Sequence, residues 1–211
     1  GILVAALAFV GGFASPAIIG SEQPNTPVLF GYLFAIAAGT LFVIRRRGWW
    51  MLGWGVLAGS ALWTVLWMLA DSDAPELHWV GLFLVGVAGL YVWATWRRMQ
   101  ASENPLLDVV TLVWASLATT GVLLAVVIVQ DGGKQIAGWF SLALYGVGVF
   151  AFGRWTPRFQ YAASLAPLFS LVTLGLWWLL ARDTPADWNE TRFGWMAVSF
   201  GGLYAAGAFA L

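Results

Sequence analysis

The sequence has no cysteine and very few charges. The absence of cysteine excludes disulfides, thiolate nucleophiles and metal sites with cysteine ligands. His78 is the single histidine, and without a second histidine or a cysteine it has no partner for metal or haem, so we predict no cofactor and no metal site. Charged residues make up 9% of the 211 residues, against about 25% in ordinary soluble domains. A composition this poor in charge predicts a membrane protein.

Charge is also lacking where transport proteins need it. No Asp, Glu, Lys, Arg or His lies in the middle third of any long apolar run. Ion-coupled carriers, pumps and voltage sensors usually carry such residues there. The chain also lacks a nucleophile–base pair, a phosphate loop and metal-ligand spacing. The polar groups at mid-depth are hydroxyls, which can hold helices together or line a pocket for a neutral or lipid-like group: Tyr91, Tyr145, Tyr204, Ser60, Thr64, Thr119, Thr120 and Ser170.

What the sequence has instead is long apolar runs. Hydrophobic residues make up 61% of the chain. A membrane-spanning helix needs about 17–25 mostly apolar residues. The short connections predict that neighbours in sequence are antiparallel neighbours in space. The sequence therefore predicts an all-α, polytopic transmembrane helix bundle of about eight spans: 2–19, 28–44, 49–70, 79–96, 106–129, 136–153, 161–181 and 193–211.

The basic residues follow the alternation of the connections. Most of them lie in the second, fourth and sixth connections, whereas most acidic residues lie in the odd-numbered ones. Short loops rich in Lys and Arg remain cytoplasmic. Both ends of the chain are then cytoplasmic. We predict that these basic residues contact phospholipid headgroups: Arg45, Arg46, Arg47, Arg97, Arg98, Arg154 and Arg158.

The stretch IRRRGWW, residues 44–50, allows two interpretations. It could be a dedicated site for phosphate or nucleic acid, or it could mark a turn at the membrane surface. Patches that bind nucleic acid are normally longer. We therefore favour the turn, with arginines at lipid phosphates and tryptophans at headgroup depth, and we predict no nucleic acid partner.

Tryptophan and glycine give further packing predictions. Tryptophans near span ends predict an aromatic belt at the two membrane surfaces: Trp79, Trp139, Trp177, Trp178 and Trp195 on the outer side, Trp93, Trp96 and Trp155 on the inner side. Trp54, Trp63 and Trp114 lie deeper and are expected to pack between helices. Two small-residue stripes are also expected to pack helices closely: Gly31, Ala35 and Gly39, and Gly55 with Gly59.

Two prolines and one acid have a structural and a functional interpretation. Pro16 and Pro167 interrupt spans, which in a transporter can form a binding site. More often a proline only kinks a helix and neighbouring groups satisfy the freed carbonyl. Asp108 follows Asn104-Pro105, so it is expected in a first helical turn, where a negative charge suits the helix dipole. We favour the structural interpretation for all three.

An internal repeat is predicted from two linked similarities. WMLADSDAP at 67–75 resembles WLLARDTPA at 178–186, and GLFLVGVAGLYV at 81–92 resembles GWMAVSFGGLYA at 194–205. The offsets are 111 and 113 residues, an almost constant period. A shift of four spans keeps the orientation, so the repeat is parallel. We therefore expect two four-helix transmembrane units, 1–104 and 105–211.

The segment 11–50 resembles a known family. Its members share a Gly-Gly-Phe and a proline in one helix, a polar loop with Asn, a Phe-x-Tyr-Leu helix, then arginines and an aromatic residue. These residues resemble the large bacterial membrane proteins grouped as domain of unknown function 2339: Gly11, Gly12, Phe13, Pro16, Asn25, Phe30, Tyr32, Leu33, Arg45 to Arg47 and Trp49. The resemblance implies a bacterial inner-membrane location and a chain longer than this one, with both ends cut. It implies no activity.

Three functional hypotheses remain open. The first is a non-enzymatic scaffold or accessory subunit of an envelope complex, which contacts lipids and other membrane subunits or further parts of its own chain. The second is a carrier or flippase for a neutral or lipid-linked substrate, which a polar cavity at mid-membrane would favour. The third is an intramembrane enzyme whose catalytic groups lie outside residues 1–211.

The topology can be tested by labelling. The loops at 45–48, 97–104 and 154–160 are expected on the cytoplasmic side, and those at 71–77 and 182–192 on the other. Cysteines introduced singly at Ser72 and Ser102 should therefore react with an impermeant reagent from opposite sides of the membrane. Labelling of both from the same side would contradict the eight-span arrangement.

Overall fold

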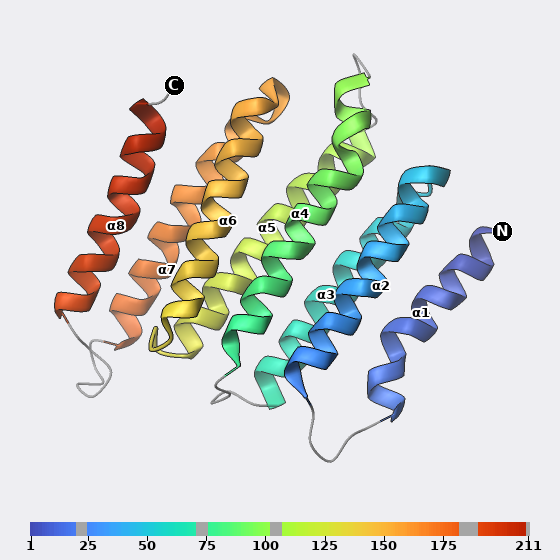
Figure 1. Cartoon of the computed structure of the whole chain (residues 1–211), viewed down its shortest axis with the longest axis horizontal. Helices are drawn as coiled ribbons and strands as arrows, with labels where there is room; N and C mark the ends of the chain where they lie inside the picture. Colours follow the sequence, from blue (N-terminus) through green and yellow to red (C-terminus); the bar gives the residue numbers. More distant parts are fainter. Residues whose placement is uncertain (20–24, 71–75, 102–106, 182–189, 210–211) are drawn as a thin grey trace. The chain divides into compact units, whose positions relative to one another are not determined.

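The structure is a computed structural model that describes residues 1–19, 25–70, 76–101, 107–181 and 190–209. Within these residues the fold is all-α (Figure 1). Eight α-helices and one 3-10 helix follow one another in the described part: α1 Ile2–Ile19, α2 Thr26–Arg47, α3 Met51–Ala70, α4 Leu77–Ala101, α5 Leu107–Gln130, α6 Ile136–Trp155, η1 Pro157–Ser164, α7 Leu165–Ala181 and α8 Glu190–Phe209.

Six of the described segments are long and apolar enough to cross a membrane. They comprise α2, α3, α4, most of α5, α6, and the segment Phe159–Leu180, which joins the end of η1 to α7. The helix α1 contributes a shorter apolar segment, Ile2–Pro16. The expected seventh span at 161–181 therefore starts as a 3-10 helix, and Pro167 lies in the first turn of α7 instead of interrupting it. A proline is well tolerated in a first turn because the N–H groups there have no partner within the helix.

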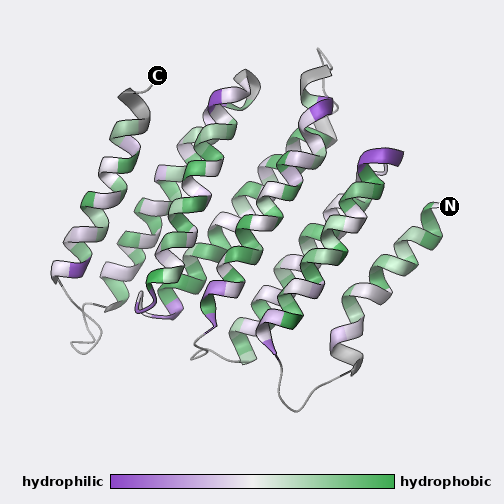
Figure 2. Cartoon of the chain, viewed as in Figure 1, coloured by the Kyte–Doolittle hydropathy of each residue, from purple (hydrophilic) through white to green (hydrophobic). Residues whose placement is uncertain are grey.

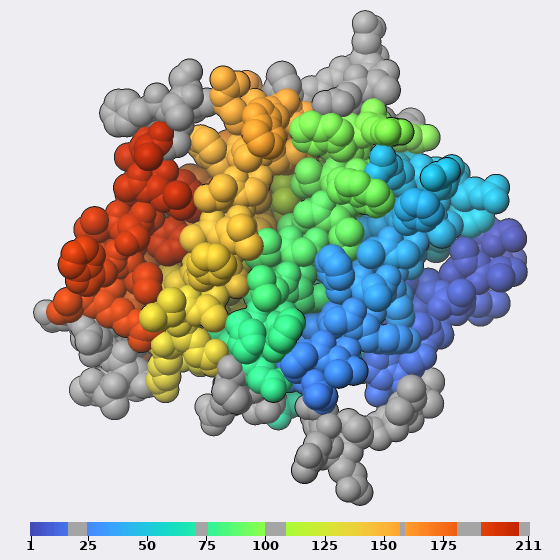
Figure 3. All heavy atoms as spheres, in the orientation of Figure 1, coloured from blue at the N-terminus to red at the C-terminus, as the bar shows by residue number. Residues whose placement is uncertain are grey.

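The chain divides into two compact units, Gly1–Thr120 and Gly121–Leu211, and α5 runs from one into the other. In the first unit, α2 and α4 lie side by side and run in the same direction (Figure 1). Their side chains fill the space between the ribbons (Figure 3). The predicted four-helix transmembrane units, 1–104 and 105–211, stay a prediction.

The face of α2 that is buried is a single helical stripe. Phe30, Leu33, Ala37, Leu41 and Ile44 are all at most 1% exposed. Their spacing of three or four residues places them on one side of the helix. Phe30 meets Phe83 of α4 with ring centroids 5.0 Å apart. The pair α2 and α3 also packs, as neighbours in sequence were expected to do, but the more extensive packing of α2 is with α4.

One of the two predicted small-residue stripes packs and the other does not. A Cβ at Gly55 would lie 3.0 Å from the Phe9 ring, and one at Gly59 would lie 2.6 Å from the Phe13 ring. The glycines of α3 thus accept the aromatic side chains of α1, as predicted. Gly31, Ala35 and Gly39 are exposed, so the prediction that this stripe packs against another described helix is wrong.

Pro16 shows how the first unit satisfies a broken helix. Proline has no N–H, so the carbonyl of Gly12, four residues earlier, loses its usual donor. The hydroxyl of Tyr32 on α2 donates to that carbonyl at 3.0 Å. The next carbonyl, that of Phe13, accepts from the Trp63 indole N–H at 2.8 Å. A neighbouring helix therefore satisfies the freed carbonyl, as the structural interpretation of Pro16 predicted, and two side chains from other helices tie α1 to the unit.

The second unit is organised around the turn between α5 and α6. Gly132 and Gly133 have φ of 64° and 66°, a left-handed conformation that glycine adopts without strain. The indole N–H of Trp177 donates to the Gly132 carbonyl at 2.8 Å, and that of Trp139 donates to the Gly133 carbonyl at 3.1 Å. Both indoles are at most 2% exposed. The prediction that these two tryptophans belong to a lipid-facing belt is therefore wrong, because they bond to the turn.

Other tryptophans divide in the same way between lipid-facing and packed positions. Trp79, Trp93, Trp155, Trp178 and Trp195 are exposed near helix ends, as a belt requires. Trp63 is packed and bonded, as predicted for a deeper position. Trp54 is 44% exposed, so its predicted packing between helices is wrong.

The role of Tyr32 can be measured with a double-mutant cycle. Tyr32→Phe removes the donor to Gly12 and should lower the free energy of unfolding by about 0.6 kcal/mol, up to about 1.7 kcal/mol, as for other hydrogen bonds between membrane helices. In a Pro16→Ala background the new N–H of residue 16 can donate to Gly12, so the same change should cost less. Unfolding in mixed micelles would measure both. Equal costs in the two backgrounds would show that Tyr32 does not compensate for the proline.

Candidate functional site: an arginine recess between α2 and α4

The site begins where α2 ends. Gly48 adopts φ 76°, the left-handed conformation that commonly terminates helices, and its N–H donates to the Ile44 carbonyl at 2.7 Å. The chain then reaches α3 within three residues, with Trp50 buried under the turn at 6% exposed. IRRRGWW is therefore a tight helix-to-helix turn, as the sequence predicted.

Four arginines meet at this end of the first unit. Arg45 and Arg46 come from the last turn of α2, and Arg97 and Arg98 come from the last residues of α4. Because α2 and α4 run in the same direction, their positively charged ends lie together (Figures 1 and 2). Cations suit the C-terminal ends of helices, where the backbone carbonyls carry partial negative charge.

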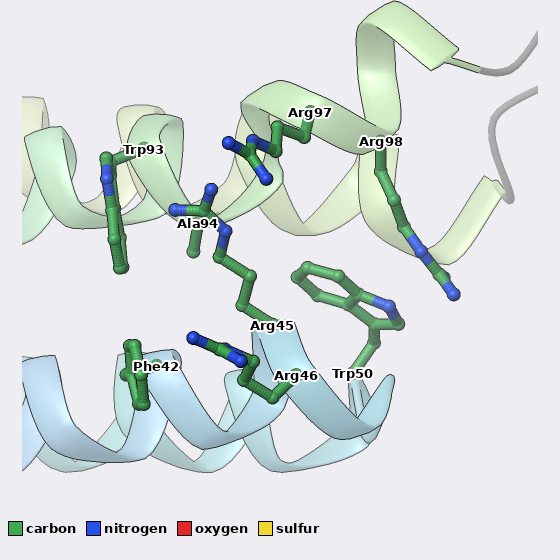
Figure 4. Close-up of a pocket in the computed structure, with 8 residues that line it drawn as sticks. All are labelled: Phe42, Arg45, Arg46, Trp50, Trp93, Ala94, Arg97 and Arg98. Carbon is green, nitrogen blue, oxygen red and sulfur yellow. The ribbon is translucent and has the colours of Figure 1, made fainter.

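Between these ends lies a cavity of about 610 Å³, which we name the arginine recess (Figure 4). Its described lining comprises the four arginines, the aromatic residues Phe42, Trp50 and Trp93, and Ala94. No acidic side chain is among these described lining residues. In Figure 4, Arg45 reaches from α2 toward Arg97 on α4, and Arg98 reaches from α4 toward Trp50.

Aromatic rings hold three of the guanidinium groups. The Arg45 guanidinium carbon lies 4.3 Å from the centroid of the Trp93 ring. That of Arg46 lies 5.1 Å from the Phe42 ring, and that of Arg98 lies 5.5 Å from the Trp50 ring. Each cation–π contact contributes about 0.5–1 kcal/mol at an exposed position and more when water is excluded. The contacts fix the charges in place without neutralising them.

Trp50 has one group without a partner. Its indole N–H is buried and has no hydrogen-bond acceptor among the described residues. An indole N–H can only donate, and so can the neighbouring Arg98 guanidinium. The recess therefore holds donors in excess of acceptors.

The other predicted headgroup arginines lie elsewhere. Arg47 is exposed and does not line the recess. Arg154 is exposed at the end of α6 in the second unit. The side chains of Arg158 and Asp108 lie outside the described residues, so their predicted roles stay predictions. The described ionisable side chains other than tyrosine sit at helix ends or in turns, as predicted for snorkelling groups.

Sequence reasoning named the arginines but missed the aromatic residues that hold them. Trp93 was assigned to the belt, Trp50 was placed at headgroup depth, and Phe42 was given no role. Phe42 lies four residues before Arg46, and such a pair shares one helix face, so this contact had a local signal. The contact of Arg45 with Trp93 joins two helices and had none. Among the described residues there is no group of three or more His, Asp or Glu side chains that could hold a metal ion.

The family model for predicted membrane proteins of domain of unknown function 2339 matches residues 1–211. The chain belongs to this DUF2339 family. The resemblance carried by residues 11–50 thus extends over the whole sequence. No curated protein and no solved structure matches the chain. The DUF2339 chain is a multi-pass membrane protein, and its membrane-embedded helices contact lipid.

Gly48 gives a prediction for the turn that builds the recess. Residues other than glycine, asparagine and aspartate are strained at its positive φ, and a Cβ there would lie 3.5 Å from the Arg98 guanidinium. Gly48→Val should therefore lower the free energy of unfolding by about 1–2 kcal/mol, whereas Gly48→Asn should cost much less.

Gly31→Ala is the matched control for this change. A Cβ at Gly31 meets no described atom within 4 Å, and alanine favours a helix over glycine by roughly 0.5–1 kcal/mol. Thermal unfolding of the three variants in detergent would measure the order of their stabilities. A Gly48→Val protein as stable as Gly31→Ala would show that the left-handed turn is not required.

Proposed function

We propose that this DUF2339 chain is a non-enzymatic scaffold or accessory subunit of an envelope complex in the bacterial inner membrane. It packs against other membrane subunits through its apolar faces and contacts phospholipid headgroups with its arginines. The eight-span arrangement, with the arginine-rich connections and both ends on the cytoplasmic side, belongs to this proposal. The distribution of Lys and Arg supports that orientation.

One observation carries the proposal: the polar groups at mid-depth bond within the protein. The hydroxyls of Thr64, Thr120, Ser170 and Thr173 donate to carbonyls of their own helices at 2.7–3.0 Å. The Tyr91 hydroxyl donates to the Gly53 carbonyl of α3 at 2.6 Å. Ser60 is an exception among the described hydroxyls, because its oxygen is buried without a partner. Hydroxyls used in this way hold helices together, which supports a scaffold over a carrier that needs a polar path.

A second observation concerns the apolar surfaces that such a subunit would present. Leu3, Leu7, Leu66, Leu69 and Leu171 are between 43% and 77% exposed. Leu3 and Leu7 are four residues apart on α1, and so share one face of that helix. Lipid covers such faces in an isolated chain. In the proposed complex, partner helices cover part of them.

The parallel repeat also belongs to the proposal, and tyrosine bonds support it. Tyr204 of α8 donates to the Ala166 carbonyl of α7 at 3.0 Å, as Tyr91 of α4 donates to Gly53 of α3. Donor and acceptor are displaced by the same 113 residues, from 91 to 204 and from 53 to 166. This is also the offset of the matching segments at 81–92 and 194–205. A conserved geometry of this kind is what a duplicated helix pair would retain.

Photocrosslinking in native membranes tests the scaffold role. A photoreactive amino acid at exposed Leu69 or Leu3 should give a discrete adduct with the same partner protein each time, in a constant ratio of partner to this chain. The matched control is Leu33, which is 0% exposed and should give no adduct between chains.

Two outcomes would contradict the proposal. One is that every exposed position crosslinks to lipid alone. The other is that the purified protein, in proteoliposomes, transports a neutral solute or a labelled lipid across the membrane faster than protein-free liposomes do. The second outcome would favour a carrier.

A further inference from the structure

The arginine recess has more positive charge than its position requires. A single arginine at the end of α2 or α4 is accounted for by the helix dipole and by snorkelling to the membrane surface. Those effects do not account for four arginines that line one cavity. Like charges held close together repel, and no described lining residue carries a negative charge to offset them. Their convergence is a cost that a bound anion would remove.

The geometry of the recess is also prepared for an anion. The guanidinium carbons of Arg45, Arg46 and Arg98 lie 4.3, 5.1 and 5.5 Å from aromatic ring centroids, so each of these side chains has an aromatic contact. The N–H donors of a guanidinium project from its edge, so a cation–π contact on the face leaves them available. The side chains are thus partly ordered before a ligand arrives, which lowers the entropic cost of binding.

The chemistry of the donors selects the class of anion. The planar fork of arginine matches phosphate oxygens in pairs. The Trp50 ring lines the recess while its indole N–H is enclosed by protein, so the donors open to a ligand are those of the arginines. Four cations exceed what one singly charged phosphodiester can neutralise. The volume of about 610 Å³ is in the range of small-ligand pockets and accommodates more than one phosphate.

We propose that the arginine recess between α2 and α4 is a binding site for a phosphate-bearing group with at least two negative charges. The rings of Phe42, Trp50 and Trp93 provide apolar contacts for the part of the ligand next to the phosphates. This inference rests on the proposed contact between the arginines and phospholipid headgroups. It replaces a general attraction to the membrane surface with binding in one cavity. The sources that share this chemistry are a lipid headgroup and a soluble phosphate or diphosphate.

Binding is tested with the intact protein in nanodiscs of zwitterionic lipid. Native mass spectrometry would count lipids retained as phosphatidate or a diphosphate-headed lipid is titrated in, with singly charged phosphatidylglycerol for comparison. The expected result is one tightly retained multiply charged lipid per chain, with phosphatidylglycerol at least about tenfold weaker. In a second arm, soluble diphosphate is added as competitor.

Two double variants that remove the same charge separate the recess from the surface. Arg45→Gln with Arg98→Gln takes two cations from the recess, and the dissociation constant should rise about 10- to 100-fold. Arg47→Gln with Arg154→Gln takes two exposed arginines that do not line it, and the constant should change less than about threefold.

Each outcome decides the proposal. Loss confined to the recess variants supports it, and soluble diphosphate then identifies the source: displacement at micromolar levels indicates a free phosphate, and no displacement indicates a lipid. Equal loss in both double variants, or no retained ligand in the native protein, would overturn it in favour of surface attraction. The photocrosslinked adduct at Leu69 does not involve the recess, so the scaffold role can fail or hold independently.

Discussion

The fold depends on one constraint: inside a bilayer no water is present to bond a free backbone group. The helices satisfy most of their N–H and C=O groups internally, and the exceptions show how side chains complete the task. Pro16 frees the Gly12 carbonyl, and Tyr32 donates to it. In the connection between α5 and α6, outside the spans, the indoles of Trp177 and Trp139 donate to the carbonyls of Gly132 and Gly133 in the same way. Aromatic residues with a polar tip are suited to this role because the ring packs while the N–H or O–H bonds.

The same constraint explains why the mid-depth hydroxyls do not point to substrate binding or catalysis. The hydroxyl of a serine or threonine in a helix can donate a hydrogen bond to the carbonyl one turn earlier. The hydroxyls of Thr64, Thr120 and Ser170 do so. Tyrosines reach across to a neighbouring helix instead, as Tyr91 does to Gly53. Polar groups used for cohesion are not available to a substrate. The groups that remain available to a ligand are the arginines at the helix ends, where a charged side chain can reach the headgroup layer.

At that end the balance of forces differs from the bilayer interior. Arginine is tolerated because it reaches the headgroup layer, and the helix dipole favours it. The tight left-handed turn at Gly48 and the parallel course of α2 and α4 bring two such ends together. The aromatic contacts of Arg45, Arg46 and Arg98 then hold the cations over one cavity. Each contribution is local, but the resulting concentration of donors is a property of the packed unit.

The sequence by itself determined the class, the family and most helix bounds, because long apolar runs and their charged ends are local signals. It also located the turn at 44–50 and the structural role of Pro16. It misplaced Trp139, Trp177 and Trp54, and it expected Gly31 and Gly39 to pack, because periodicity does not say which face of an apolar helix meets lipid and which meets protein. It treated the arginines as separate surface groups. Only the tertiary structure placed Arg45 over Trp93 and Arg98 over Trp50, since contacts between α2 and α4 or between α4 and the turn before α3 depend on how the helices pack and leave no local pattern.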